Sequence, residues 1–219
     1  MDDAAPRTFR LIVWPSVITL LITAVRLLGE VQGWINVDAG GAFAPLGITW
    51  CVFLFGGWFG RRLSNLGSTP RVRRPWVWLL LLALLMVGGV MWRFSRLDPN
   101  DASDAGFAAL RAQGQIVGCI ALAAMVATFA VWPRLAWTLL CYGVVARLGV
   151  LAATWLAKDQ GWITHHVKFG PAGILRASTA ETMIGAAFPQ LLFWVPFTVV
   201  MGTLTGSLFA RSRPTAAAA

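Results

Sequence analysis

Charged residues are scarce in this chain. They make up 12% of its 219 residues, whereas hydrophobic residues make up 58%. Soluble domains carry about 25% charged residues, so this composition indicates an integral membrane protein. The net charge of +9 does not indicate nucleic-acid binding, because the cations lie mostly in short segments between apolar runs, where topology signals are found.

Cysteines and catalytic motifs are also sparse. The three cysteines, Cys51, Cys119 and Cys141, all lie within apolar runs and show no C-x-x-C spacing, which indicates neither a disulfide framework nor a metal cluster. The H-E-x-x-H, G-x-S-x-G, P-loop and Rossmann motifs are all missing from the sequence. We therefore predict no cofactor and no metal site, and a protein that is not an enzyme.

Long apolar runs are what the chain does contain. A bilayer core of about 30 Å requires about 20 helical residues, and six runs approach this length, at residues 11–28, 43–60, 75–92, 115–132, 135–156 and 183–209. They predict an all-α polytopic membrane protein with a single six-helix transmembrane domain over residues 11–210, for which three hairpins are one compatible arrangement. Residues 1–10 precede the domain, and the tail 211–219 is expected to be disordered.

The distribution of cations predicts the orientation of the spans. The segments on the side of the two termini are the richer in Lys and Arg, and they include the stretch Arg71-Val-Arg-Arg74. By the positive-inside rule, both termini are expected in the cytoplasm. Arginine strongly outnumbers lysine, which suggests a GC-rich bacterial genome, so we expect the protein in a bacterial inner membrane.

Two pairs of glycines have the G-x-x-x-G spacing that lets membrane helices approach closely. Gly56 and Gly60 form the first pair, and Gly202 and Gly206 form the second. They predict a helix-packing seam, although chance occurrence in a glycine-rich membrane protein is an equally good explanation.

The last helix has clear signals for its start and for a kink. Ser178 and Glu181 fit the S-x-x-E capping box, which predicts a helix that begins before its apolar part. Pro189 and Pro196 each remove a backbone donor, so we expect this helix to bend, with Pro189 as its hinge.

The strongest functional signal is Arg147, which lies about 18 Å along the fifth run at 1.5 Å per residue. An arginine at that depth costs at least about 2.5–3.5 kcal/mol to insert, and no acid lies in an apolar run at the same level. Three interpretations are open. In the first, Arg147 has a structural role and donates to carbonyls or polar side chains. In the second, it pairs with an acid such as Glu30 or Glu181. In the third, it binds an anionic ligand.

A second group of residues lies at the predicted outer surface. Arg26 and Glu30 are four residues apart and share a helix face, which predicts an ion pair. Alternatively, Arg26 joins a cationic cluster in the loop 158–176, formed with His165, His166, Lys168 and Arg176, that attracts carboxylate or phosphate. Adjacent histidines point in different directions, so they are poor ligands for one metal ion, but a pH-sensitive loop remains an alternative.

Three function classes follow from these residues. The leading one is a membrane binding or transport protein with an outward-facing cationic cleft for an anionic solute or lipid headgroup; the ligand-binding residues would be Arg147, Arg26, Glu30, His165, His166, Lys168 and Arg176. The second is a structural or assembly subunit of a larger membrane complex. The third is a lipid-modifying membrane enzyme that uses His165 or His166. The expected partners are membrane lipid, an anionic small molecule or membrane protein subunits, and not nucleic acid.

Overall fold

The computed structural model describes residues 4–37, 46–96, 104–169, 174–175 and 178–210. Within these ranges the fold is dominated by helices: α1 (Ala4–Val31), α2 (Thr49–Asn65), α3 (Pro75–Arg96), α4 (Asp104–Val131), α5 (Pro133–Asp159), α6 (Thr179–Pro189) and α7 (Val195–Phe209). A five-residue π-helix, η1 (Gln190–Trp194), joins α6 to α7. Two short segments, β1 (Lys168–Phe169) and β2 (Ile174–Leu175), pair antiparallel in the loop before α6. The predicted all-helical fold class is therefore confirmed.

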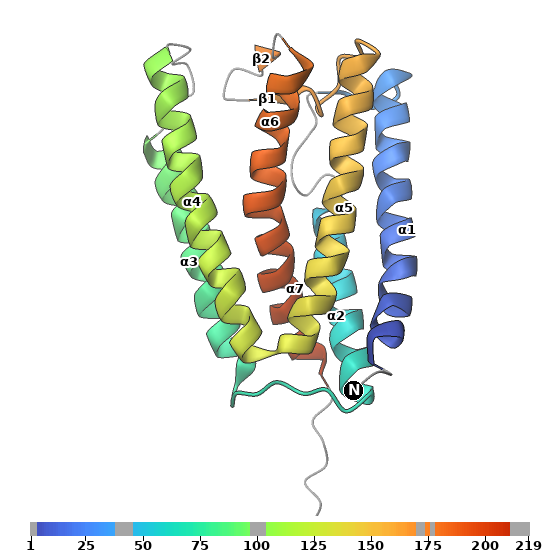
Figure 1. Cartoon of the computed structure of the whole chain (residues 1–219), viewed down its shortest axis with the longest axis vertical. Helices are drawn as coiled ribbons and strands as arrows, with labels where there is room; N and C mark the ends of the chain where they lie inside the picture. The colour runs from blue at the N-terminus through green and yellow to red at the C-terminus, as the bar shows by residue number, and fades with distance from the viewer. Residues whose placement is uncertain (1–3, 38–45, 97–103, 170–173, 176–177, 211–219) are drawn as a thin grey trace, which may run out of the picture.

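Five helical segments in the described part of the chain are long and apolar enough to cross a membrane, namely Arg10–Val31, Pro75–Arg96, Ala108–Val131, Pro133–Asp159 and Thr179–Phe209. This supports the expectation of a polytopic membrane protein. The α2 helix differs because its 17 residues extend about 26 Å, less than the core of about 30 Å. Figure 1 shows α2 only in the lower part of the bundle. The second predicted span, over residues 43–60, therefore remains a prediction.

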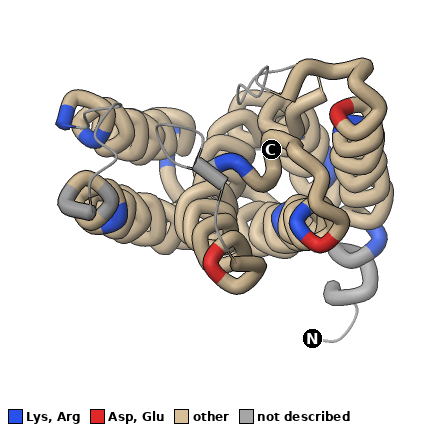
Figure 2. The backbone as a smooth tube through the Cα atoms, turned by 90° about the horizontal axis from the view of Figure 1, so that it is seen from above, with Lys and Arg blue, Asp and Glu red and all other residues tan. Residues whose placement is uncertain are grey.

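The helices run alternately up and down, so α1 begins and α7 ends at the same end of the bundle, at the bottom of Figure 1. We call this the proximal end, and the opposite end the distal end. The predicted cytoplasmic location of the proximal end stays a prediction. The α7 helix is central, because it contacts α2, α3, α4 and α5. The pair of α3 and α4 stands to one side of the other helices when the bundle is viewed from above (Figure 2).

The two G-x-x-x-G motifs pack against each other where α2 meets α7. A Cβ atom added at Gly56 would lie 2.5 Å from the carbonyl oxygen of Gly202 and 2.6 Å from its Cα, and Gly60 faces Gly206 as closely. Leu139 of α5 packs on the same seam, only 2.6 Å from where a Cβ of Gly202 would be. The predicted packing seam is confirmed, since neither backbone leaves room for a side chain.

A buried polar contact joins α1 to α5 within the apolar core. The Thr19 Oγ1 and the Tyr142 hydroxyl are 2.8 Å apart, and the Tyr142 ring meets those of Phe55 and Phe59 edge-on, at centroid distances of 5.7 Å. A buried hydroxyl needs such a partner, because an unpaired one is costly in an apolar environment. This arrangement fixes the middle of α5, the helix that carries Arg147.

The sixth predicted helix starts as expected and then changes its winding. The capping box is confirmed, because the Glu181 N–H donates to Ser178 Oγ and the Ser178 N–H donates to Glu181 Oε2, both at 3.2 Å. Beyond Pro189 the chain widens into η1, where the Val195 N–H donates to the Gln190 carbonyl. Pro196 lacks an N–H, and its ring would clash with the carbonyl four residues earlier in an α-helix. A π turn just before Pro196 avoids this conflict and places an irregular segment between the two prolines.

Candidate functional site

Arg147 lies inside the bundle near the middle of its helix. The α5 helix has 27 residues, and Arg147 lies about 21 Å from its first residue at 1.5 Å per residue. Only 4% of the Arg147 surface is exposed. The side chain therefore neither faces lipid nor reaches an aqueous surface.

Both protein contacts of the Arg147 guanidinium come from η1. Its Nη1 donates to Gln190 Oε1 at 3.3 Å, and its Cζ lies 4.9 Å from the centroid of the Trp194 ring. A desolvated cation–π contact is worth about 2 kcal/mol or more. The Nε atom of Arg147 is buried and has no hydrogen-bond partner among the described residues, so they satisfy only part of the guanidinium.

No carboxylate among the described residues lies within ion-pair distance of Arg147. Glu30 is instead in contact with Arg26 and His165, and Glu181 caps the start of α6. The structure thus places neither of the two acids considered for Arg147 beside it. Its positive charge has no negative partner in the described part of the bundle.

The first turn of α2 adds positive potential to the same region. Cys51, the third residue of α2, is fully buried, and α2 packs against α5, the helix that carries Arg147. Ile48, at the N-cap of α2, makes no side-chain hydrogen bond to the first backbone N–H groups of this helix. Because the N-terminal end of a helix carries a partial positive charge, the start of α2 is an electropositive element in the bundle, as Arg147 is.

Four of the predicted site residues form a separate cluster at the distal end, which we call the Glu30 cluster: Arg26, Glu30, His165 and His166. The predicted pair is confirmed, because Arg26 Nε donates to Glu30 Oε1 at 3.0 Å. The same carboxylate accepts the backbone N–H of His165 at 3.0 Å, and His165 Nδ1 lies 2.5 Å from Oε1. Both Arg26 and Glu30 are buried, so this carboxylate neutralises the arginine.

The two histidine rings of the Glu30 cluster lie against each other, with their centroids 3.9 Å apart and their planes tilted by 42°. Burial lowers the pKa of His166 to about 3, with smaller effects from His165 and Arg26 in the same direction. Burial also lowers the pKa of His165, although contact with Glu30 opposes this shift. Both rings are therefore neutral near pH 7, and they add no positive charge to the distal end.

The predicted cleft residues are thus divided between two places. Among the described residues, neither a hydrogen bond nor an ion pair joins Arg147 to the Glu30 cluster, and Figure 2 shows Lys and Arg spread over separate helices. Lys168 lies on β1, and Arg176 lies outside the described residues. The structure therefore separates Arg147, a buried cation without a carboxylate partner among the described residues, from the Glu30 cluster at the distal end, which is nearly neutral.

Gln190 and Trp194 were not predicted as neighbours of Arg147. One signal was available for Gln190, which follows Pro189 and is the only glutamine in the last apolar run. A lone amide in a membrane helix is a natural partner for a lone arginine. Trp194 looks like an ordinary interfacial or core residue, and nothing in its spacing points to Arg147.

Within the described residues, no three His, Cys, Asp or Glu side chains are placed to hold a metal ion. Comparison of the chain with protein-family models, curated proteins and solved structures gives no match.

Proposed function

We propose that this protein is a membrane binding or transport protein that accepts an anion at Arg147. The observation that supports this is the buried guanidinium at the middle of α5, whose Nε has no partner and which meets no described carboxylate. Removing the counter-charge of a buried ion costs about 3–5 kcal/mol in measured cases. A bound anion would offset a penalty of this kind.

The free edge of the guanidinium indicates the chemistry of the ligand. Arginine binds carboxylate and phosphate through parallel N–H groups, and Nε is one of these groups on Arg147. The positive end of α2 near Cys51 favours the same charge. We therefore propose a carboxylate or phosphate group as the part of the ligand that is bound, whether it belongs to a solute or to a lipid headgroup.

The π turn is the proposed moving part. Gln190 and Trp194 both contact Arg147, and both belong to the single turn between Pro189 and Pro196. A change in this turn would withdraw both contacts together and free the guanidinium for the ligand. Pro189 retains its proposed role as the hinge, at the boundary where α6 gives way to η1.

A structural or assembly subunit is the second candidate. It is favoured by the same two contacts, because Gln190 and Trp194 satisfy part of the guanidinium and fix α5 to η1. The lipid-modifying enzyme is not favoured by the geometry. With a pKa of about 3, His166 would be a weak base, and an effective general base needs a pKa near the working pH.

The test is purification in native-lipid nanodiscs, followed by mass spectrometry of co-purified small molecules, lipids and proteins. Three forms are compared: wild type, Arg147→Met, and Arg61→Met as a matched loss of an exposed arginine. The proposal predicts an anion that is retained by wild type and Arg61→Met and lost from folded Arg147→Met. If no anion depends on Arg147 and a protein copurifies in fixed ratio, the chain is a subunit and the proposal is wrong.

A further inference from the structure

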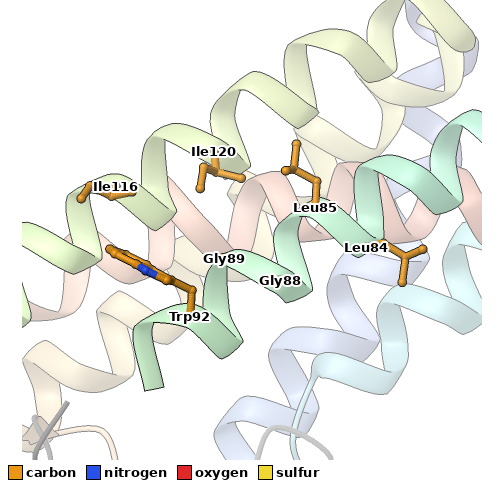
Figure 3. Close-up of a pocket in the computed structure, with 7 residues that line it drawn as sticks. All are labelled: Leu84, Leu85, Gly88, Gly89, Trp92, Ile116 and Ile120. Carbon is orange, nitrogen blue, oxygen red and sulfur yellow. The ribbon is translucent and has the colours of Figure 1, made fainter. Parts of the chain in front are cut away.

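An apolar groove of about 550 Å³ runs between α3 and α4. Its walls include Leu85 and Trp92 of α3 and Ile116 and Ile120 of α4, and Gly88 and Gly89 form part of its floor (Figure 3). We call it the α3–α4 groove. It lies within two of the segments apolar enough to cross a membrane, so it faces the lipid region and not water.

The glycines leave the α3–α4 groove open. A Cβ atom added at Gly88 would meet nothing within 4 Å, whereas one at Gly89 would lie 3.3 Å from Ile120 Cδ1. Trp92 stands at the distal end of the groove, beside Ile116 (Figure 3). The result is a slot with apolar walls, in which no side chain of the described residues covers Gly88.

Two buried polar atoms that have no partner in the described part of the chain lie at the level where this slot ends. Arg93 Nε and Gln113 Oε1 are both inaccessible to water and form no hydrogen bond with a described residue. Arg93 is one turn beyond Gly89 on the same face of α3. Gln113 is one turn before Val117, which packs at Gly89, and α4 runs opposite to α3 (Figure 1). Arg93 and Gln113 therefore reach the same level at the distal mouth of the groove.

The depth of this mouth matches the headgroup region of a bilayer. The α3 helix has 22 residues, or about 33 Å, enough to cross a core of about 30 Å. Arg93 lies in its last turn. A phosphate would meet Arg93 at this depth, while an acyl chain would extend along Gly89, Gly88 and Leu85 towards the middle of the membrane.

We propose that the α3–α4 groove is a binding site for one phospholipid whose headgroup carries a hydrogen-bond donor. One acyl chain fills the slot over Gly88, the phosphate accepts from Arg93 Nε, and the ammonium of ethanolamine or a hydroxyl of glycerol donates to Gln113 Oε1. Charge complementarity supports a lipid as the occupant, because Arg96 and Arg111 are also exposed near this end of the hairpin. This site is independent of the anion proposed at Arg147.

The test is native mass spectrometry of delipidated protein titrated with phosphatidylglycerol, phosphatidylethanolamine or phosphatidylcholine of identical acyl chains. Wild type should bind one molecule of either of the first two about fivefold more tightly than phosphatidylcholine, because choline has no donor for Gln113 and one hydrogen bond is worth about 1 kcal/mol. Gln113→Leu should remove this preference while it leaves chain binding intact.

Two further variants test the slot and the phosphate contact. Gly88→Leu places a side chain in the slot at a position where a Cβ meets nothing within 4 Å, and Arg93→Leu removes the donor. Each variant should weaken lipid binding at least tenfold. Val87→Leu, on the exposed face next to the groove, is the matched control and should change nothing. Equal binding of the three lipids by wild type and Gly88→Leu would mean unspecific annular lipid and overturn the proposal. Loss of an oligomer in Gly88→Leu, with lipid binding unchanged, would assign the groove to a protein helix and overturn it as well.

Discussion

Glu30 on α1 accepts the backbone N–H of His165 at 3.0 Å across 135 positions of sequence. Through its other oxygen it also holds Arg26 Nε at 3.0 Å. Beneath this contact, Leu27 of α1 packs in one apolar cluster with Ala157 of α5 and Val167 of the loop. One carboxylate thus ties the distal end of α1 to the loop that follows α5.

Replacing Glu30 should be strongly destabilising. Glu30→Gln leaves Arg26 buried without a counter-charge and weakens the bond to the His165 backbone, so we expect a loss of about 3–5 kcal/mol. The measurement is equilibrium unfolding of the purified protein in a mild detergent. The double variant Arg26→Gln/Glu30→Gln is the control and should recover most of the loss, because neither charge then remains; additive losses would contradict the pairing.

The adjacent buried histidines predict a loss of stability in acid. Because burial lowers the pKa of His166 to about 3, below its ordinary value of about 6.5, the unfolded chain takes up a proton before the folded one does. Stability is therefore complete above about pH 6.5 and falls as the pH decreases towards 3. At pH 5 the loss from His166 is about 2 kcal/mol, from 1.36 kcal/mol per pH unit.

The measurement for this prediction is the midpoint of thermal unfolding at pH 7.5 and at pH 5. His166→Phe keeps a ring beside His165 and does not titrate, so it should show a clearly smaller decrease than wild type. Arg26, Glu30 and His165 remain in the variant and account for the decrease that is left. An equal pH dependence in wild type and His166→Phe would contradict the assignment.

Much of this fold follows from local spacing in the sequence. The apolar runs predict the helices, the four-residue separation predicts the Arg26–Glu30 pair, and Ser178 and Glu181 predict the capping box. Each of these depends on the geometry of a single helix, which the spacing of residues determines. The two G-x-x-x-G motifs of the glycine seam are also visible in the sequence. The sequence does not show which helices these motifs join.

The surroundings of Arg147 depend on geometry between helices, which spacing does not determine. Gln190 and Trp194 reach Arg147 from η1, and a π turn shifts the register of every residue after it. The two prolines predict an irregularity but not its type. For the same reason, Arg147 and the histidines were expected in one cleft, whereas the structure places them in two clusters.

The glycine seam between α2 and α7 should respond to a single methyl group. Gly56→Ala brings a Cβ to 2.6 Å from the Gly202 Cα, so the helices must separate, and we expect a loss of about 1–3 kcal/mol, as for overpacked cores. Gly88→Ala is the matched control, because its Cβ meets nothing within 4 Å. That variant should be neutral or up to about 1 kcal/mol more stable, since alanine favours helix. Equal thermal stability of the two variants would contradict the observed packing.

Arg147 should stabilise the complex with its anion and destabilise the protein without it. The guanidinium is buried and lacks a described counter-charge, and a buried charge without a partner is costly because nothing offsets its loss of hydration. Arg147→Met keeps most of the volume, so in ligand-free protein we expect its unfolding midpoint to equal or exceed that of wild type. Arg147→Lys keeps the charge but loses the flat guanidinium over Trp194, and should be less stable than both.

The relation between ligand and stability separates the two leading functions. If Arg147 binds an anion, addition of the anion identified by mass spectrometry should raise the midpoint of wild type with the logarithm of its concentration, once this exceeds the Kd, and leave that of Arg147→Met unchanged. If Arg147 is a structural contact to Gln190 and Trp194, Arg147→Met should unfold at a clearly lower temperature even without ligand, and no anion should distinguish the variants. Thermal unfolding of both proteins, with and without the anion, therefore decides whether the charge at the middle of α5 is held for a ligand or for the fold.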